Sequence, residues 1–346
     1  MNDVVIGRNE LKQIIMKNGE KEGKIIEALI EITAQCNYSC EYCYIHGSSN
    51  KQMMFSDYCL AIDELSQNGC VYLTISGGEP LTHPDFSKIY LYARSKIPFV
   101  TIFTNGSLFT EETIDLLSSY KPYDIEVSLY GTKKESYDAF VKRKGAFSVL
   151  ERNLAALETK CIPYSLKTTL TTISEPLSYY TDYAKKRKVS FRFDSMVIPS
   201  IDNTEPFESN LRLSANAAVQ AVSRQREYIE KLKEKYLENK AISHQLYTCS
   251  AGINSILIDV ELNVGLCVAA RTPSYSLRTN TLEKIHLRLM SCHDRELSST
   301  DKCYDCELKL FCRYCPGRFE KEGYSMQAPP PWTCQYASAL ADIIKE

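Results

Sequence analysis

Short apolar runs alternate with amphipathic segments along the first part of the chain. Runs rich in β-branched and aromatic residues predict six strands, at 25–33, 70–76, 97–104, 124–129, 164–172 and 189–196. Amphipathic segments between them predict helices at 55–69, 111–119, 146–159 and 175–187. Strands that alternate with helices in this way pack as a parallel sheet, and functional groups then gather at the carboxyl ends of the strands.

The pattern changes after the sixth strand. Turn-forming residues predict a linker at 199–210, and residues 213–240 predict one long charged helix. Residues 244–346 have few periodic segments and many cysteines, and a small region of that kind needs cross-links or metal to be stable. We therefore expect four parts: an N-terminal extension (1–24), a core domain (25–198), a linker with a connecting helix (199–243) and a cysteine-rich domain (244–346).

The composition is that of a globular protein without an unusual charge. Of 346 residues, 44% are hydrophobic and 24% are charged, which supplies enough apolar material for a core. The 41 basic and 43 acidic residues give a net charge of −2, so the chain has no global attraction to nucleic acid or to an anionic membrane. No apolar run is long enough to span a bilayer, and the polar start lacks the features of a signal peptide. These observations predict a cytoplasmic protein with no nucleic-acid or membrane partner.

The cysteine content is the one unusual feature of the composition: the chain has 14 cysteines, and most of them are clustered in the sequence. In a reducing compartment, clustered cysteines more often bind metal or carry out redox chemistry than form disulfides. Three others, Cys59, Cys70 and Cys161, fall inside predicted helix or strand segments and are expected to be small buried core residues.

The first cluster has the spacing C-x3-C-x2-C and follows the first predicted strand. It consists of Cys36, Cys40 and Cys43. A cubane cluster of four irons usually takes four thiolates, so a loop with three leaves one iron open to an external ligand with an amine and a carboxylate. Zinc is the alternative, because a structural zinc site would need a fourth protein ligand and His46 is close in sequence.

A second motif, Gly77-Gly78-Glu79-Pro80, follows the second predicted strand. Two glycines allow the backbone to come close to a ligand, and a neighbouring carboxylate can hold an ammonium group by charge-assisted hydrogen bonds. Either motif alone is weaker evidence than the two together, each at a strand end in a βα series.

This pair of motifs resembles the radical S-adenosylmethionine (radical SAM) enzymes over about residues 25–200. The resemblance implies an α/β fold, a partial (β/α)6 TIM-type barrel. It also implies that three cysteines hold a [4Fe–4S] cluster whose fourth iron binds the amino and carboxylate groups of S-adenosylmethionine. In that family one electron from the cluster cleaves the sulfonium, and the 5′-deoxyadenosyl radical removes a hydrogen atom from the substrate.

The resemblance also assigns cofactor contacts residue by residue. Tyr42 would lie near adenine, and Ser76, Gly77, Gly78 and Glu79 would hold the methionyl amine. Thr104 and Asn105 match a Thr-Asn-Gly turn close to the cofactor, and Ser128 would contact ribose or carboxylate, although the Asp-Gly that usually follows is Tyr130-Gly131 here. Arg143 would face the methionyl carboxylate. A solvated charge run with Lys142 and Lys144 is the alternative for that segment.

The C-terminal cysteines resemble a SPASM domain over about residues 245–337, an extension of radical SAM enzymes that carries auxiliary iron–sulfur clusters. Two C-x2-C pairs could instead form a zinc ribbon, but seven cysteines are too many for one zinc site. In the family the ligands interleave, so one cluster would use Cys303, Cys306, Cys312 and Cys334, and the other would use Cys249, Cys267 and Cys315.

This array departs from the SPASM pattern in three places. The hairpin glycine expected five residues before Cys267 is Leu262, the last cysteine pair is C-x2-C where C-x3-C is common, and an extra cysteine of some members is replaced by Ser243. The inner auxiliary cluster therefore has three evident thiolates. Its fourth site is open to an exogenous ligand or substrate, or is filled by His244 or Cys292.

Radical SAM proteins with SPASM domains mostly modify peptides or proteins, by cross-links, thioethers or formylglycine formation. Val268 replaces the Asp that usually serves as a base in the formylglycine-forming group, which argues against that reaction. The expected partners are a peptide or protein substrate and an electron donor of the flavodoxin or ferredoxin type. About 25 residues precede the first strand, so a leader peptide would be recognised by a separate leader-binding protein or by another surface of the chain. The alternatives are a tetrapyrrole, redox-cofactor precursor or sugar as substrate, or a non-catalytic iron–sulfur or zinc protein.

Overall fold

The computed structural model of the chain describes residues 7–40, 42–45, 50–201, 209–238 and 243–346. Nine strands form one sheet in the order β6-β5-β4-β3-β2-β1-β7-β8-β9. The first six are parallel: β1 (Glu27–Thr33), β2 (Tyr72–Gly77), β3 (Phe99–Thr104), β4 (Asp124–Ser128), β5 (Ser165–Thr169) and β6 (Phe191–Asp194). All six predicted strands are therefore present and each is shorter than predicted, with β5 and β6 about half the predicted length.

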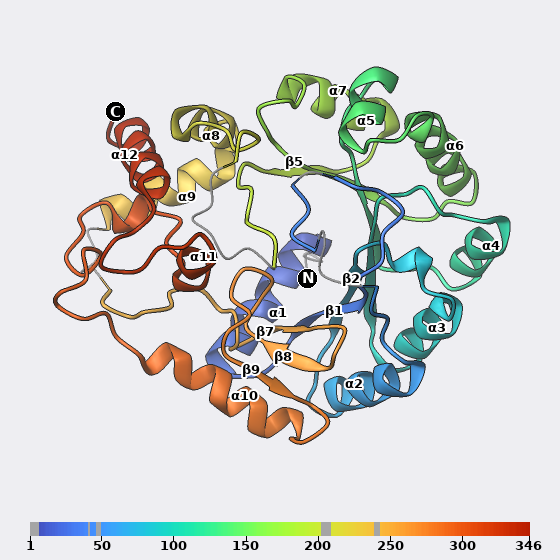
Figure 1. Cartoon of the computed structure of the whole chain (residues 1–346), viewed down its shortest axis with the longest axis horizontal. Helices are drawn as coiled ribbons and strands as arrows, with labels where there is room; N and C mark the ends of the chain where they lie inside the picture. Colours follow the sequence, from blue (N-terminus) through green and yellow to red (C-terminus); the bar gives the residue numbers. More distant parts are fainter. Residues whose placement is uncertain (1–6, 41, 46–49, 202–208, 239–242) are drawn as a thin grey trace, which may run out of the picture.

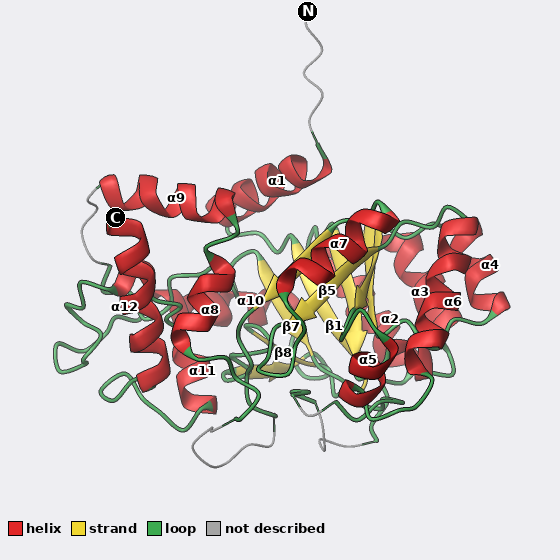
Figure 2. Ribbon diagram, turned by 90° about the horizontal axis from the view of Figure 1, so that it is seen from above, coloured by secondary structure: helices red, strands yellow, loops and turns green. Residues whose placement is uncertain are grey.

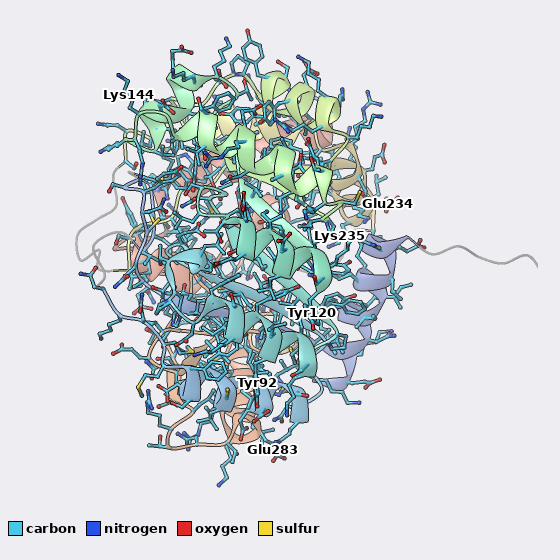
Figure 3. The ribbon with its side chains drawn as sticks, turned by 90° about the vertical axis from the view of Figure 1, so that its right-hand side faces the viewer. Tyr92, Tyr120, Lys144, Glu234, Lys235 and Glu283 are labelled. Atoms are coloured by element: carbon cyan, nitrogen blue, oxygen red, sulfur yellow. The ribbon has the colours of Figure 1, made fainter. Side chains whose placement is uncertain are left out.

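Helices cover the outer face of this parallel sheet, which closes part of a barrel (Figure 1). They are α2 (Phe55–Gln67), α3 (Phe86–Lys96), α4 (Glu111–Ser119), α5 (Lys134–Phe140), α6 (Ala146–Thr159) and α7 (Leu177–Arg187). The predicted α/β architecture is confirmed. The outward sides of the helices are polar, and Tyr92 of α3 donates to the Asp63 carboxylate of α2 at 2.9 Å (Figure 3).

The core lies between the sheet and these helices because one side of each strand is apolar. In β3, Val100 and Ile102 are fully buried, whereas the alternating residues Phe99, Thr101 and Phe103 are only partly buried. This alternation is the two-residue period of a strand, and it places the second set of side chains on the inner side of the barrel. The barrel interior is therefore open to polar and charged groups, while its wall is held by apolar packing.

Helix α1 (Arg8–Glu22) lies across the amino-terminal end of the barrel (Figure 2). Its Lys12 forms an ion pair with Glu27 at the start of β1 and lies over the Tyr72 ring, and Arg8 lies over the Tyr123 ring. The carboxyl ends of the strands, where the two predicted motifs fall, are at the opposite end of the barrel.

The cysteine-rich region continues the same sheet. Strand β7 (Ser255–Ile258) pairs in parallel with β1, from Glu27 opposite Ser255 to Ile30 opposite Ile258. Strands β8 (Asn263–Gly265) and β9 (Ser274–Ser276) follow in antiparallel pairs. Ile256 and Ile258 therefore share the apolar core of the barrel.

The predicted single helix at 213–240 is wrong, because the structure has two helices there, α8 (Ala215–Val222) and α9 (Arg226–Leu237). The helix breaks after Val222, and Gln225 leaves the helical conformation with ψ of 79°. Helix α8 buries Ala218, Val219 and neighbouring residues against α12 (Pro331–Lys345), whereas the charged α9 buries only Leu232. The helices pack differently because the apolar stripe of α8 does not continue into α9.

The remaining elements are short apart from α10 (Leu282–Met290). They are the helix α11 (Pro316–Lys321) and the 3-10 turns η1 (Pro80–Thr82), η2 (Ser291–Asp294) and η3 (Lys309–Phe311). Within the described ranges, no helix has the combination of length and apolar character that a membrane crossing requires.

Candidate active site

The first cysteine loop leaves the carboxyl end of β1 and brings its three thiols close to one another. Burial raises the pKa of Cys40 to about 12, and negative charge at Cys43 and Cys36 adds to this rise. The Cys43 N–H donates to the Cys40 carbonyl at 3.2 Å, which closes a tight turn between two of the cysteines. His46, the candidate ligand of a zinc site, lies outside the described residues.

The glycines after β2 pack against the residues that lead into this loop. The Gly78 N–H donates to the Thr33 carbonyl and the Glu79 N–H to the Gln35 carbonyl, both at 2.8 Å. A Cβ on Gly77 would lie 2.2 Å from Thr33 O, and one on Gly78 would lie 2.3 Å from Gln35 O. The absent side chains therefore let two backbones approach each other. The sequence suggested that these glycines let the backbone come close to a ligand. In the structure they let it come close to Thr33 and Gln35 of the same chain.

Glu79 is fully buried and joins the ends of β2 and β3. Its carboxylate accepts hydrogen bonds from Thr104 Oγ1 at 2.7 Å, from the Asn105 N–H at 2.7 Å and from the Leu81 N–H at 3.1 Å. Burial raises the pKa of Glu79 to about 7, although these bonds favour its ionised form. Three of the predicted site residues thus form one connected unit. The predicted ammonium contact of Glu79 would come in addition to these bonds.

Asn105 extends this unit to the cysteine loop. Its Nδ2 donates to Asn37 Oδ1 at 2.9 Å and lies 3.9 Å from Cys36 Sγ. Asn37 in turn donates to Ser107 Oγ at 2.8 Å, and Ser107 donates to Asn105 Oδ1 at 2.6 Å. We did not predict Asn37 or Ser107 from the sequence. Their only signal was their position next to Cys36 and after the Asn-Gly turn.

Tyr42 belongs to an aromatic wall beside the cysteine loop. Its ring lies 5.3 Å from Phe140 and 6.2 Å from Tyr130, and these two rings stack at 5.2 Å. Burial raises the pKa of Tyr42 well above its usual value, and hydrogen bonding with Tyr130 and Thr169 opposes the rise. Tyr130, which replaces the usual Asp after β4, therefore packs here, close to the predicted contact Ser128 at the end of that strand.

Arg143 contacts the first cysteine loop, where its guanidinium donates to the Asn37 carbonyl at 3.2 Å. Arg143 is exposed, as are the flanking Lys142 and Lys144, and Lys144 lies at the outer surface (Figure 3). Its contact with a methionyl carboxylate stays a prediction.

The C-terminal cysteines form two groups in space. Burial raises the pKa of Cys312 to about 12, and Cys303, Cys334 and Cys306 add to the rise through their charges. These four residues are therefore neighbours, and we call them the outer group.

Burial likewise raises the pKa of Cys315, with further contributions from Cys267 and Cys249. These three residues form what we call the inner group. The structure thus brings together the two sets of cysteines that the sequence paired, although their role as metal ligands stays a prediction.

The candidate fourth ligands of the inner group differ in position. His244 stacks on Tyr304 with ring centroids 3.9 Å apart and lies 3.3 Å from Asp305. Because Tyr304 lies between Cys303 and Cys306 in the sequence, His244 is on the side of the outer group. Cys292 is buried in the apolar core, where its thiol faces the Arg288 carbonyl at 3.9 Å.

The three scattered cysteines also differ from one another. Cys70 is buried, as predicted, and Cys59 is partly buried. Cys161 is exposed in a turn with φ of 50°, so the prediction that it is a core residue is wrong.

The donor set fits iron–sulfur centres, because thiolates are the usual ligands of such clusters and three separate groups of thiols are present. In the described part of the chain, no three His, Cys, Asp or Glu side chains are arranged closely enough to hold a metal ion as they stand. The cysteines of each group are therefore near one another without forming a finished metal site. Their fit to an iron–sulfur cluster rests on the chemistry of the thiol donors.

Comparison with known proteins identifies the class of the barrel. Residues 30–186 match the sequence model of the Radical SAM superfamily, so this part of the chain is a radical SAM domain. The matched segment contains the first cysteine loop, the Gly77-Gly78-Glu79 turn and the Asn105 network.

Two curated relatives match a part of the chain of similar length. The subtilosin biosynthesis protein AlbA of Bacillus subtilis (strain 168) is 31% identical over 149 residues, which are 42% of this chain and 33% of AlbA. The AdoMet-dependent heme synthase of Methanosarcina barkeri is 34% identical over 148 residues, 40% of this chain and 41% of the synthase. The chain thus spans less than half of the length of either relative.

The fold of nearly the whole chain is shared with a solved structure. Streptococcus suis SuiB, bound to its precursor peptide SuiA, superposes with a TM-score of 0.70 over 96% of this chain and 82% of SuiB. The two sequences are 14% identical, so this likeness shows a common fold alone.

Proposed function

We propose that this protein is a radical SAM enzyme that modifies a ribosomally made peptide or protein. The observation that carries the proposal is the single connected unit at the carboxyl ends of β1, β2 and β3. There Glu79, Thr104 and Asn105 join the cysteine loop through hydrogen bonds. This is the edge of a parallel barrel at which a cofactor binds, and it lies within the radical SAM domain.

In this proposal Cys36, Cys40 and Cys43 would hold a [4Fe–4S] cluster at which S-adenosylmethionine would bind. When bound, these cofactors supply a carbon radical strong enough to remove a hydrogen atom from an unactivated C–H bond. The chain's own residues position the nucleoside and methionyl groups. Tyr42 and its aromatic neighbours form an apolar wall for the adenine ring, and the Arg143 charge at the loop suits a carboxylate.

The remaining predicted contacts follow from their places at the strand ends. Ser76 and Gly77 end β2, Gly78 follows that strand directly, and Ser128 ends β4, so all four lie at the rim where the cofactor would bind. The outer group and the inner group of cysteines would hold two auxiliary iron–sulfur clusters. Because His244 stacks on Tyr304, on the side of the outer group, we favour an exogenous ligand at the fourth site of the inner group.

A peptide substrate is supported by the kinds of protein that are similar to this chain. AlbA is named for the biosynthesis of a bacteriocin, and SuiB was solved with a precursor peptide. Val268 stands where a formylglycine-forming enzyme would have an Asp, so we expect a cross-link, a thioether or another oxidative modification. We also propose a separate leader-binding protein, an electron donor of the flavodoxin or ferredoxin type and a cytoplasmic location, where thiols stay reduced.

A second candidate is a small-molecule substrate of the tetrapyrrole kind, because the heme synthase of M. barkeri is 34% identical to this chain over 148 residues. The two are separated by incubating the reduced, iron-loaded protein with S-adenosylmethionine and either peptides encoded beside its gene or a tetrapyrrole precursor. The proposal predicts that a peptide increases 5′-deoxyadenosine formation and loses the mass of two hydrogens. Turnover of the tetrapyrrole, with no peptide changed, would contradict it.

A further inference from the structure

The inner side of the barrel carries a pair of cations close to the rim, one on β5 and one on β6. Lys167 lies opposite Ser128 of β4 on one side and opposite Arg192 of β6 on the other. Residues paired across strands point to the same side of a sheet, and Leu166, the neighbour of Lys167 along β5, is buried in the core on the other side. Lys167 and Arg192 therefore both face the inner side, where their side chains are 30% and 57% exposed.

The two cations share one carboxylate and one aromatic ring. Arg192 binds the Glu126 carboxylate of β4 in a fork, from Nε to Oε2 and from NH2 to Oε1, the second at 2.7 Å. The Lys167 ammonium is 3.6 Å from Glu126 Oε1, which is longer than a hydrogen bond. Both cations lie over the Phe103 ring, Lys167 at 5.1 Å and Arg192 at 5.8 Å from its centroid. This cluster therefore has two positive charges and one negative charge.

The other carboxylates on this side of the sheet have partners of their own. Asp194, at the end of β6, accepts a hydrogen bond from Arg313 NH1 at 3.0 Å. Asp124, at the start of β4, accepts one from Ser165 Oγ. Among the described residues, neither carboxylate lies within ion-pair distance of Lys167. The positive charge of Lys167 thus has no carboxylate to itself.

The pKa of Lys167 agrees with this shortage of negative charge. Burial lowers it, and the neighbouring charge of Arg192 lowers it further, whereas the charges of Glu126 and Asp194 oppose the change. The ammonium group is held in a partly desolvated position without a full counter-charge. A carboxylate bound beside it would supply that charge and would accept charge-assisted hydrogen bonds from its N–H groups.

This pair of cations borders the place that the proposed function gives to the cofactor. Thr169, two residues further along β5, is a hydrogen-bond partner of Tyr42 in the aromatic wall. Thr169 and Lys167 face the same side of the strand, and two residues span about 7 Å along it. Lys167 therefore lies one step inside the rim, next to Ser128 at the end of β4. A group bound at this point would lie beside the cofactor.

We propose that Lys167 and Arg192 form a subsite inside the barrel that binds a carboxylate of the substrate and so determines which substrates are accepted. This inference rests on the proposed function and deepens it by naming the chemical group that is recognised. In a peptide, that carboxylate belongs to an Asp or Glu side chain or to the C-terminus. The two cations make and break no bond; they bind the substrate and orient it beside the cofactor.

The test compares Lys167→Met, Lys167→Arg and the control Lys160→Met in the full-length, iron-loaded protein. Methionine is unbranched like lysine but has no charge, whereas arginine keeps the charge. Lys160 forms an ion pair with Asp115 at 2.9 Å, and both side chains are exposed at the outer surface of the helices. The control therefore removes one lysine charge and one ion pair without changing the inner side of the barrel.

The probe is a fluorescently labelled peptide that is encoded beside the gene and accepted by the native protein. Its binding is measured with S-adenosylmethionine present and no reductant. Each Asp or Glu of the peptide is replaced in turn by Asn or Gln, and one further version has an amidated C-terminus. Lys167→Met is expected to weaken binding of the unaltered peptide by about 10- to 100-fold, and Lys167→Arg to restore most of this loss. One neutralised version should bind equally weakly to the native protein and to Lys167→Met.

Three further measurements separate this role from a structural one. Formation of 5′-deoxyadenosine without peptide and the Kd of S-adenosylmethionine should be the same in the native protein and all three variants. With reductant, the change in Lys167→Met should appear in the KM for the peptide rather than in kcat. The unfolding temperature of Lys167→Met should not fall, because the lost charge had no full partner.

Unchanged peptide binding in Lys167→Met would overturn the inference, as would an equal loss in Lys160→Met. It would also be overturned if no neutralised peptide bound more weakly to the native protein, since no carboxylate would then be recognised. Weaker binding of S-adenosylmethionine in Lys167→Met would overturn it as well, because the subsite would then hold the carboxylate of the cofactor. These results leave the proposed function standing as long as the native protein modifies the peptide.

Failure of the proposed function gives a different result. If the native protein turns over a tetrapyrrole precursor and no peptide, the proposed function is contradicted, and the subsite is tested with that precursor and its methyl ester. A ratio of binding constants between acid and ester that is the same in Lys167→Met and the native protein would overturn the inference there too. If the native protein forms no 5′-deoxyadenosine, the proposed function and the inference fall together.

Discussion

Gly78 is needed at its position because it has no side chain, and not because of any chemical group that it supplies. A Cβ at this position would lie 2.3 Å from the Gln35 carbonyl oxygen, in the segment that leads into Cys36. Gly78→Ala must therefore push the cysteine loop away from its place, at a cost of about 1–3 kcal/mol in the free energy of unfolding. We expect the variant to bind less iron at the first centre, measured by iron content and 5′-deoxyadenosine formation.

Gly69→Ala is the matched control for this substitution. Gly69 has φ of +81°, but a Cβ there would meet no atom within 4 Å. The control therefore carries only backbone strain, of about 1–2 kcal/mol, and should keep its iron. Equal iron content in Gly78→Ala and the native protein would show that the loop does not depend on this close approach.

The buried carboxyl group of Glu79 makes a pH-dependent contribution to stability. Burial raises its pKa from 4.5 to about 7, so between these values the folded protein binds a proton that the unfolded chain releases. The stabilisation from this group is present below pH 4.5 and is lost as the pH rises towards 7. Gln does not titrate, so the advantage of the native protein over Glu79→Gln should shrink across this interval.

Urea unfolding of both proteins at several pH values within that interval measures this difference directly. An advantage that grows with pH would mean that the three hydrogen bonds to the carboxylate outweigh its burial and hold the pKa of Glu79 below its usual value.

At the scale of single elements, the hairpin formed by β7 and β8 carries a strained residue. Leu262 has φ of +65° at the position where the SPASM pattern usually has glycine, and its side chain is fully buried. Leu262→Gly relieves about 1–2 kcal/mol of strain but removes a buried side chain that contributes about 2–5 kcal/mol. We expect a net loss of stability of about 1–3 kcal/mol by chemical denaturation. A glycine variant more stable than the native protein would show that the strain outweighs the packing.

The elements that could be predicted are those with a clear period. The alternation in 97–104 and the apolar stripe in 146–159 located β3 and α6 within two residues. Strand β7 is only four residues long and follows no periodic segment, so nothing in the sequence indicated that it pairs with β1. Helix α1 was missed because most of its side chains are polar or exposed.

The site could be predicted where residues form contiguous motifs and could not where the contacts are long range. Cys36, Glu79 and Asn105 stand in recognisable turns at strand ends, and the structure brings them together. Glu31 and Arg271, which form an ion pair at 2.6 Å, are 240 positions apart, and an isolated charged residue carries no sign of its partner. Their pairing depends on the sheet continuing from β1 into β7, which is a property of the fold rather than of any local pattern.

For the whole molecule, the structure predicts that the cysteine-rich region is needed for the barrel to be stable. Ile256, Ile258, Leu262 and Val264 are buried in the same core as the barrel, and β7 covers the edge of β1. A fragment of residues 1–243 would expose this apolar surface and an unpaired strand edge, which promotes aggregation. We expect it to lack a cooperative thermal unfolding transition in calorimetry.

A fragment that instead unfolds cooperatively at the temperature of the full chain would show that residues 25–198 form an independent domain, as the sequence alone suggested. A fragment that is unfolded would indicate that the sheet and its core form one unit across that boundary.

The most direct test of the account is electron paramagnetic resonance of the reduced protein in which Cys36, Cys40 and Cys43 are all replaced by Ala. The account predicts that the variant loses the one signal that changes when S-adenosylmethionine is added and forms no 5′-deoxyadenosine. Signals from the inner and outer groups of cysteines should remain. A variant that keeps the signal responsive to S-adenosylmethionine and still forms 5′-deoxyadenosine would contradict the central claim.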